Sequence, residues 1–300
     1  MMDVLSDVLK LLRLHASVYF NADFCGGWTI SSPEHNKASY HIIERGTCWL
    51  HFGEDQQPLT LRGGDLVFFP RDIRHMMSNS SEKQPLAPPG VVAPDTEGPT
   101  TRMVCGYFEF ESNLVNPILN ALPDVVHIQN DDPDNAIWLE ALLSQICRET
   151  EMNALGSKAV IDKLSDVLFV QIIRCWINKK ASEQGLLAAL ADPQISAALQ
   201  HIHQSPNTVW TVESLAQQVG MSRSAFAKRF QTVMGATPMH YLAHWRMQKA
   251  HELLTTSNQS VAQIAEQFNY QSEASFSKAF KQHMDIGPGA VRRAKKAALT

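Results

Sequence analysis

The feature that most constrains this chain is an internal repeat in its last third. The second copy follows the first at a displacement of 49 residues, which becomes 50 after a turn. The matching segments are 215–221 with 264–270, 225–230 with 275–280, Met234 with Met284, and Pro238 with Pro288. Solenoids usually need three or more repeats, so two copies favour a tandem pair of compact motifs over a structural array.

Each copy has the pattern of a helix, a short turn and a second helix. Ser222 precedes the second helix of the first copy and Ser272 that of the second, where a serine hydroxyl can accept backbone N–H groups as an N-cap. The turn holds Gly220 in the first copy and Asn269 in the second. Because asparagine tolerates the left-handed conformation better than most residues, both copies can form the same turn.

In each second helix two phenylalanines stand four residues apart, Phe226 with Phe230 and Phe276 with Phe280. This spacing places both rings on one helical face, which can pack on the first helix. The opposite face carries small and basic side chains, as a helix that enters the major groove requires. The DNA-contacting residues predicted in this way are Arg223, Ser224, Ala227, Lys228, Glu273, Ser275, Ser277 and Lys278.

Residues 239–254 form a predicted helix that holds the two motifs at a fixed separation, so that both second helices can enter successive major-groove segments. Arg246, Lys249 and the basic tail 292–296 are candidates for phosphate contacts, which add to the salt dependence of binding. For the tail, a solvated chain end is an equal alternative. Residues 191–300 carry eleven Lys/Arg and six Asp/Glu, a net charge of +5, against −9 for residues 1–190. This division is common in nucleic-acid binders with a regulatory domain.

Residues 193–293 resemble the DNA-binding domain of the AraC/XylS family of bacterial transcription regulators. The matching motifs are 210–216, 221–226, 250–254, 260–265 and 272–281. The resemblance implies that the second helix of each unit contacts bases, and that promoter DNA and RNA polymerase are partners. One departure is Val291, because the family usually has an aromatic residue before the arginine that is Arg292 here.

The first third of the chain is predicted to form short strands. Residues 40–43, 48–52, 66–69 and 103–108 are runs of β-branched or aromatic residues, and turns such as 62–65 separate them. Several short strands at this spacing favour a β-barrel or sandwich. Residues 84–99 contain five prolines and two glycines, which predict a loop between two strands.

Residues 20–112 resemble a cupin barrel. The pattern Gly64-Asp65-x4-Pro70-x-Asp72-x2-His75-x3-Asn79 is similar to the second cupin motif, with Asp72 in place of a glycine, and residues 41–46 are similar to the end of the first motif. Enzymatic cupins carry a His-x-His pair there, whereas residues 34–40 offer only His35. A non-enzymatic barrel is therefore expected. The alternative is a metal-dependent cupin enzyme, an isomerase or dioxygenase, with an accessory DNA-binding domain.

Four residues of this region are candidates for a metal or redox site: Cys25, His41, His75 and Cys105. Imidazole and thiolate groups bind zinc and other transition metals, and a thiolate of low pKa reacts with oxidants. The alternative is that they are buried core residues, as expected for Cys48, Cys147 and Cys175, which lie in apolar runs. No cofactor is certain, and a small organic effector beside Trp28 and Trp49 is a further alternative.

Residues 135–178 have the three-to-four spacing of two amphipathic helices. They are predicted to form a homodimer interface, although packing on their own barrel is the alternative. Residues 1–14 predict an amphipathic helix without the pattern of a signal peptide. No run of about 18 uncharged apolar residues occurs, so no membrane span is expected and the predicted location is the cytoplasm. Five cysteines without a CxxC motif encode no disulfide framework.

The sequence thus predicts an α+β protein of two domains joined by helices. A cupin-like sensing domain spans residues 1–112, linker and dimerisation helices span 113–190, and a helical DNA-binding domain spans 191–300. The predicted function is a sequence-specific transcription regulator, not an enzyme, that senses a small molecule, a metal or an oxidant. The sequence does not specify the effector, the operator or the direction of regulation.

Overall fold

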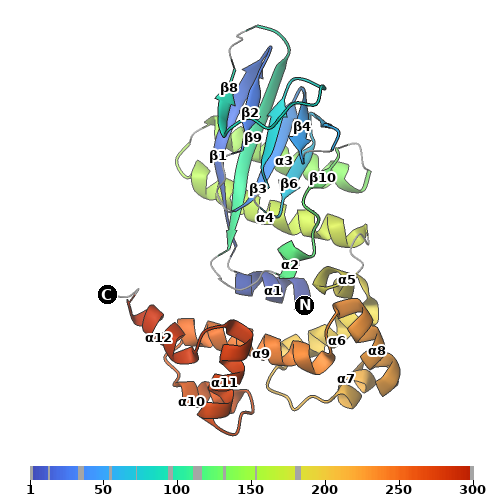
Figure 1. The fold of residues 1–300 in the computed structure, drawn as a ribbon, viewed down its shortest axis with the longest axis vertical. Helices are drawn as coiled ribbons and strands as arrows, with labels where there is room; N and C mark the ends of the chain where they lie inside the picture. The colour runs from blue at the N-terminus through green and yellow to red at the C-terminus, as the bar shows by residue number, and fades with distance from the viewer. Residues whose placement is uncertain are drawn as a thin grey trace. The chain divides into compact units, whose positions relative to one another are not determined.

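The chain forms two compact units in a computed structural model (Figure 1). The structure describes residues 3–12, 14–32, 37–53, 56–71, 73–93, 97–110, 117–130, 133–152, 154–179 and 184–297. Leu14–Glu111 and Ile118–Trp176 form one unit, here called the sheet unit. Met1–Arg13, Ser112–Pro117 and Ile177–Thr300 form the other, here called the helical unit. None of the described helices is long and apolar enough to cross a membrane.

The sheet unit contains two antiparallel five-stranded sheets within the described residues. The first has the order β1 (Leu14–Cys25), β9 (Thr100–Phe110), β3 (Ala38–Arg45), β6 (Leu66–Phe69) and β10 (Val126–Ile128). The second has the order β5 (Leu59–Arg62), β4 (Thr47–Phe52), β7 (His75–Ser78), β2 (Thr29–Ser31) and β8 (Gly90–Val92). The four strands predicted from apolar runs are confirmed, as parts of β3, β4, β6 and β9.

The inner strands of the first sheet, β9, β3 and β6, bury residues on both of their faces. In β9, Met103 and Cys105 belong to the apolar cluster shared with the second sheet, whereas the ring of Phe108 lies 5.0 Å from that of Phe169 in α4 (Ser157–Asn178). Successive side chains of a strand point to opposite faces, so alternate residues fill the barrel and the layer under the helices. Figure 1 shows α3 (Pro133–Met152) and α4 beside the strands.

Position 106 of β9 requires a glycine, because the side chain of Tyr40 in β3 approaches the backbone there closely. A Cβ atom built on Gly106 would lie 2.3 Å from Cζ of Tyr40, well inside van der Waals contact. The Tyr40 hydroxyl lies 2.8 Å from Oγ of Ser165 in α4, and all three residues are buried. One aromatic side chain therefore fixes the distance between the sheet and α4.

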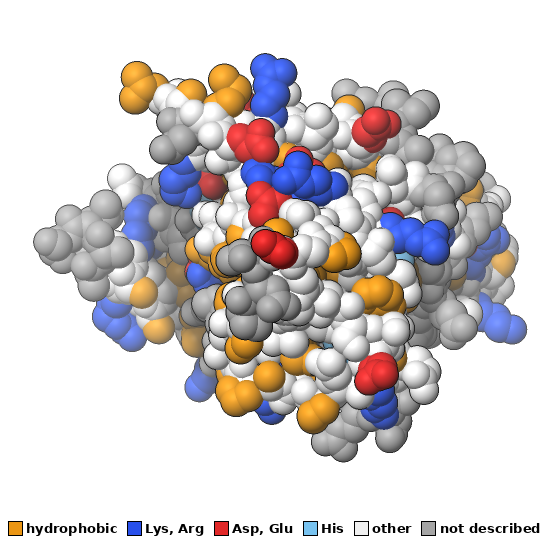
Figure 2. Space-filling model, turned by 90° about the horizontal axis from the view of Figure 1, so that it is seen from above, with side chains coloured by type: hydrophobic (Ala, Val, Ile, Leu, Met, Phe, Trp, Pro, Cys, Tyr) orange, Lys and Arg blue, Asp and Glu red, His pale blue; other side chains and the backbone are white. Residues whose placement is uncertain are grey.

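Ion pairs join neighbouring side chains on the surface of the sheet unit. Arg102 contacts Asp23 and Glu44 at 2.8 and 2.7 Å, and Glu151 of α3 at 2.9 Å. The face of the molecule in Figure 2 shows acidic and basic side chains next to one another, without a field of one charge. Among the described residues of this face there is no broad basic surface of the kind that would attract nucleic acid.

The division into units differs from the predicted domain boundaries at two places. The predicted N-terminal helix is present as α1 (Val4–Leu12), but it packs on α6 (Pro193–Gln204) and α9 (Pro238–Thr256) of the helical unit. Its buried side chains Val4 and Val8, four residues apart, form the packed face. The helices predicted as a separate linker, α3 and α4, belong instead to the sheet unit.

One local prediction was wrong. The segment 84–99, predicted as a loop throughout, contains β8, which pairs with β2 at the edge of the second sheet. All three residues of β8 are exposed, with Val91 at 50% and Val92 at 61%. Backbone pairing alone holds this strand. Its residues therefore do not alternate between buried and exposed, and the sequence lacks the pattern that would predict a strand here.

The helical unit contains the predicted tandem motifs. The first is α7 (Val212–Gln218) with α8 (Arg223–Met234), and the second is α10 (Val261–Gln267) with α11 (Glu273–Met284). The helix α9 joins them, and α5 (Leu186–Ala191) and α12 (Pro288–Ala297) are further helices of this unit, whereas α2 (Pro117–Asn120) lies mostly in the sheet unit. Ser222 accepts from the backbone N–H of Ala225, and Ser272 from that of Ser275, which confirms both predicted caps. The second motif packs with α9 and α12 around one apolar cluster.

Candidate DNA-binding and ligand sites

The helices α8 and α11, here called the recognition helices, present equivalent faces. Phe226, Phe230, Phe276 and Phe280 are fully buried, as their spacing predicts. Of the predicted DNA-contacting residues, Ala227 and Ser277 are partly exposed and six are exposed: Arg223, Ser224, Lys228, Glu273, Ser275 and Lys278. Each set is thus accessible to solvent on its helix, away from the buried phenylalanines.

The charged groups of this surface differ in how they are engaged. Lys228 and Lys278 are exposed and form no hydrogen bond or ion pair with another residue that the structure describes. Arg229, which the sequence did not single out, donates from Nε to Asp192 Oδ2 at 2.8 Å. Asp192 also caps α6, so Arg229 joins α8 to α6. The two lysines are therefore available cations of the recognition helices, as are the exposed Arg223 of α8 and Lys281 of α11.

The hydroxyl group of Ser275 already forms hydrogen bonds with Ser272. Ser275 Oγ donates to the carbonyl oxygen of Ser272 at 2.8 Å and accepts from Ser272 Oγ at 3.1 Å. Since a hydroxyl has one proton to donate, Ser275 can meet a base in this conformation only as an acceptor or through its Cβ.

Several candidates for phosphate contacts are used inside the fold. Arg246 donates to the carbonyl oxygens of Pro206 and Thr208 at 2.7 and 2.9 Å, and burial lowers the pKa of its guanidinium. Arg292 donates to the carbonyls of Ser257 and Gln259, and Lys295 to that of Ser257. Lys249 pairs with Glu252. The side chain of Lys296 lies outside the described residues. Arg246, Arg292 and Lys295 hold loops in place, because carbonyl groups beyond helix ends lack partners within the helices.

In the barrel the structure brings His41 and His75 together. Their Nε2 atoms lie 2.7 Å apart, and both side chains are buried. His75 Nδ1 lies 2.8 Å from the carbonyl oxygen of Ile73, so it carries a proton and donates. With both rings neutral, His75 Nε2 accepts from His41 Nε2. Burial, together with His75, lowers the pKa of His41. His41 Nδ1 is buried and has no hydrogen-bond partner among the described residues.

The two cysteines of the predicted metal or redox site are not equivalent. Cys105 is opposite His41 in the β3–β9 register, which places both side chains on one face of the sheet. Burial raises the pKa of the Cys105 thiol. In the register of β1 and β9, Cys25 is opposite Thr100 and Cys105 is opposite Phe20. Cys25 therefore lies five residue steps along β1 from the partner of Cys105, about 16 Å of strand.

The predicted four-residue site is therefore not assembled. Within the described parts of the chain, no group of three or more His, Cys, Asp or Glu residues is arranged to hold a metal ion. Asp72 and His35 of the cupin-like motifs lie outside the described residues. The four residues do not form one metal centre in this structure, because the strand register keeps Cys25 away from Cys105.

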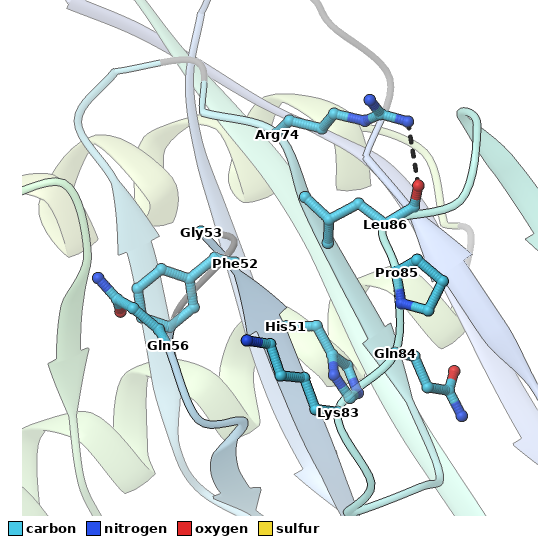
Figure 3. A pocket seen from close by; sticks show the side chains of 9 residues that line it. All are labelled: His51, Phe52, Gly53, Gln56, Arg74, Lys83, Gln84, Pro85 and Leu86. Atoms are coloured by element: carbon cyan, nitrogen blue, oxygen red, sulfur yellow. Dashed lines mark hydrogen bonds between the residues drawn. The ribbon is translucent and has the colours of Figure 1, made fainter.

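The sheet unit also contains a hollow that the sequence analysis missed. Its volume is about 570 Å³, and its lining residues are His51, Phe52, Gly53, Gln56, Arg74, Lys83, Gln84, Pro85 and Leu86. Figure 3 shows these side chains around the end of β4 and the segment that crosses it. The tryptophans proposed as a pocket lie elsewhere: Trp28 is in the core, stacked on Phe24 at 4.7 Å. No local pattern marks the hollow, because its walls come from three separate segments.

Comparison with known proteins gives matches to both units. Residues 3–178 match the family described as Cupin, and residues 215–294 match the family described as Helix-turn-helix domain. An HTH-type transcriptional regulator of Haemophilus influenzae is 34% identical over 97% of this chain and 99% of its own length. The HTH-type transcriptional regulator AlkR of Acinetobacter baylyi is 32% identical, with the same two shares. A putative AraC-like transcription regulator of Streptomyces lividans is 30% identical over 97% of this chain and 98% of its own length. With its two helix-turn-helix motifs and its barrel, the chain belongs to the family of AraC-like transcriptional regulators that carry an N-terminal cupin domain.

Proposed function

We propose that this regulator binds promoter DNA by placing α8 and α11 in successive major-groove segments, and that its sheet unit responds to a small ligand. The observation that carries the proposal is the equivalence of the two recognition helices. Each buries two phenylalanines and exposes a lysine at the same register position, Lys228 or Lys278. One continuous helix, α9, joins the two motifs and limits their separation.

The DNA-binding part is tested by selecting duplexes from a random-sequence pool with the full chain. We expect one enriched sequence with two conserved blocks about one helical turn apart. Lys228→Ala and Lys278→Ala should each weaken binding to that sequence by about 1–3 kcal/mol if the side chains contact bases. Lys163→Ala, an exposed lysine of α4 that pairs with Asp166, is the control.

Equal weakening on the selected sequence and on random DNA would assign the two lysines to phosphate contacts. Failure to enrich any sequence would contradict the proposal.

We further propose that the protein acts as a homodimer through α4. The outer side of this helix exposes Val160 at 40% and Val167 at 48%, seven residues apart and thus on one face. Packing on the sheet uses the other face, with Leu168 and Phe169, so both alternatives from the sequence can hold at once. The same face of a second copy would bury both valines across a two-fold axis.

Val160→Asp combined with Val167→Asp should convert the dimer to a monomer, as measured by light scattering. The control is Lys10→Gln, an exposed lysine of α1 away from α4. A monomeric wild-type protein at all concentrations would contradict the dimer.

The remaining roles follow from the family. The regulator is proposed to act in the cytoplasm, to contact RNA polymerase and to have no catalytic activity. Support for the last point is that the neutral His41–His75 pair is buried in the barrel core, where a substrate could not reach it.

A further inference from the structure

The hollow in the sheet unit lies where three segments meet. His51 and Phe52 are the last residues of β4, Arg74 directly precedes β7, and residues 83–86 cross in front of them. Figure 3 shows the Lys83 and Phe52 side chains on the same side of His51, with Arg74 at the far end beside Leu86. At about 570 Å³, the hollow has the size of sites that take small organic molecules.

The charged residues of its described lining are both cations, Arg74 and Lys83. Arg74 donates from Nη2 to the carbonyl oxygens of Leu86 and Ala87 at 3.1 and 3.2 Å, and no carboxylate of the described residues pairs with it. Lys83 is exposed and has no ion pair within the described chain. Two cations that have no counter-charge among the described residues, beside a concave surface, favour an anionic ligand.

The other walls are largely apolar. The ring of Phe52 and the side chains of Pro85 and Leu86 line the hollow, with the amides of Gln56 and Gln84 at its sides. A flat aromatic ring can stack on Phe52 and gain more than its burial alone. An inorganic anion without an organic body could contact the cations, but it would leave the apolar walls exposed to water.

The hollow is connected to the histidine pair of the barrel. In the β4–β7 register, Phe52 is opposite His75 and His51 is opposite Met76. His51 also lies 2.9 Å from Ser78 through its Nε2. A ligand that draws Arg74 toward the hollow would act on the first residues of β7, and thus on His75. Such a ligand changes the equilibrium only if it binds two arrangements of the strand with different affinity.

We propose that this hollow binds a small organic acid, a carboxylate on an aromatic body, with Lys83 at the carboxylate, Phe52 beside the ring, and Arg74 adding positive potential from the far end. The inference rests on the proposed function, because it gives the ligand class to which the sheet unit responds. Binding of the acid can nevertheless be measured without DNA.

The test is titration calorimetry of the full chain with trans-cinnamate. Cinnamyl alcohol has the same skeleton without the charge, and inorganic phosphate has charge without the aromatic body. We expect cinnamate to bind at about millimolar concentration, as its few atoms allow, and both other probes to bind at least about tenfold more weakly. Arg74→Gln and Lys83→Gln should each weaken cinnamate binding by about tenfold.

Lys10→Gln, an exposed lysine of α1, is the matched control and should leave the affinity unchanged. Because Arg74 also holds the 86–87 carbonyls, Lys83→Gln supplies the variant that breaks no hydrogen bond of the described structure. Circular dichroism confirms that each variant is folded.

Three results would overturn the inference: no heat of binding with cinnamate, equal binding of cinnamate and cinnamyl alcohol, or wild-type affinity in both the Arg74 and Lys83 variants. In each case the selection of a DNA sequence by the same preparation reports separately on the proposed function. A preparation that selects DNA and ignores cinnamate refutes the site alone.

Discussion

Asn269 donates from Nδ2 to the carbonyl oxygen of Asn207 across 2.5 Å. This bond joins the turn of the second helix-turn-helix motif to the loop that precedes the first. Arg246 of α9 holds the same loop through the carbonyls of Pro206 and Thr208. The second motif and α9 therefore both hold the loop that leads into the first motif, in addition to the covalent link between the motifs through α9.

Replacing Asn269 tests this link. Asn269→Gly retains the positive φ of 63° and removes the amide. We expect affinity for DNA with both sequence blocks to fall by about two- to tenfold, the effect of one neutral hydrogen bond. Fluorescence anisotropy measures the change on duplexes with both blocks or with one. Gly220→Asn, at the equivalent turn where φ is 68° and a Cβ meets no atom within 4 Å, is the reciprocal control. An equal loss on duplexes with one block would show that Asn269 acts only within its own motif.

Gly106 should not tolerate a side chain. In Gly106→Ala the new methyl group would overlap the Tyr40 ring, which is fully buried. Overpacking of this kind costs about 1–3 kcal/mol, and we expect the urea midpoint of the sheet unit to fall accordingly. Gly287→Ala, whose Cβ meets nothing within 4 Å, is the control. An unchanged midpoint would mean that Tyr40 leaves its position at little cost.

His203 should make the helical unit sensitive to acid. Burial lowers the pKa of His203 to about 3, with Lys249 adding to the effect. Its ring stacks on Trp245 at 3.5 Å, and Asp7 Oδ2 lies 3.7 Å from its Nδ1. The unfolded chain takes up a proton near pH 6.5, so stability is complete above that pH and is lost as the pH falls toward 3. At pH 5 the loss should be about 2 kcal/mol.

Urea unfolding at pH 7 and pH 5 measures this difference. His203→Gln should reduce the dependence on pH. Stability that rises on acidification would contradict the assignment.

The five cysteines should differ widely in reactivity. Cys25 is half-buried, and the other four are buried. Burial raises the pKa of Cys48 and of Cys147 to about 12, and that of Cys105 as well. Because the thiolate is the reactive form, iodoacetamide should modify Cys25 first in the native protein, as read by mass spectrometry.

Cys25→Ser should abolish this fast modification. Peroxide should produce no Cys25–Cys105 disulfide, since the strand register keeps the two residues apart. Detection of that disulfide in the native protein would show that β1 and β9 shift their register.

The sequence by itself determined the local structure of the helical unit. The repeat, the serine caps and the Gly220–Asn269 equivalence all depend on residues a few positions apart, so the short-range rules of helix and turn formation suffice to predict them. Four strands of the sheet unit, β3, β4, β6 and β9, follow in the same way from short apolar runs.

Only the tertiary structure decided which distant residues meet. It placed α1 on the helical unit, turned Arg246 and Arg292 toward loop carbonyls, paired His41 with His75, and left Cys25 apart from Cys105. The hollow beside Arg74 and Lys83 likewise has walls from three segments. A side chain's chemistry is set by the neighbours that packing and strand register bring to it, and these neighbours are remote in the sequence.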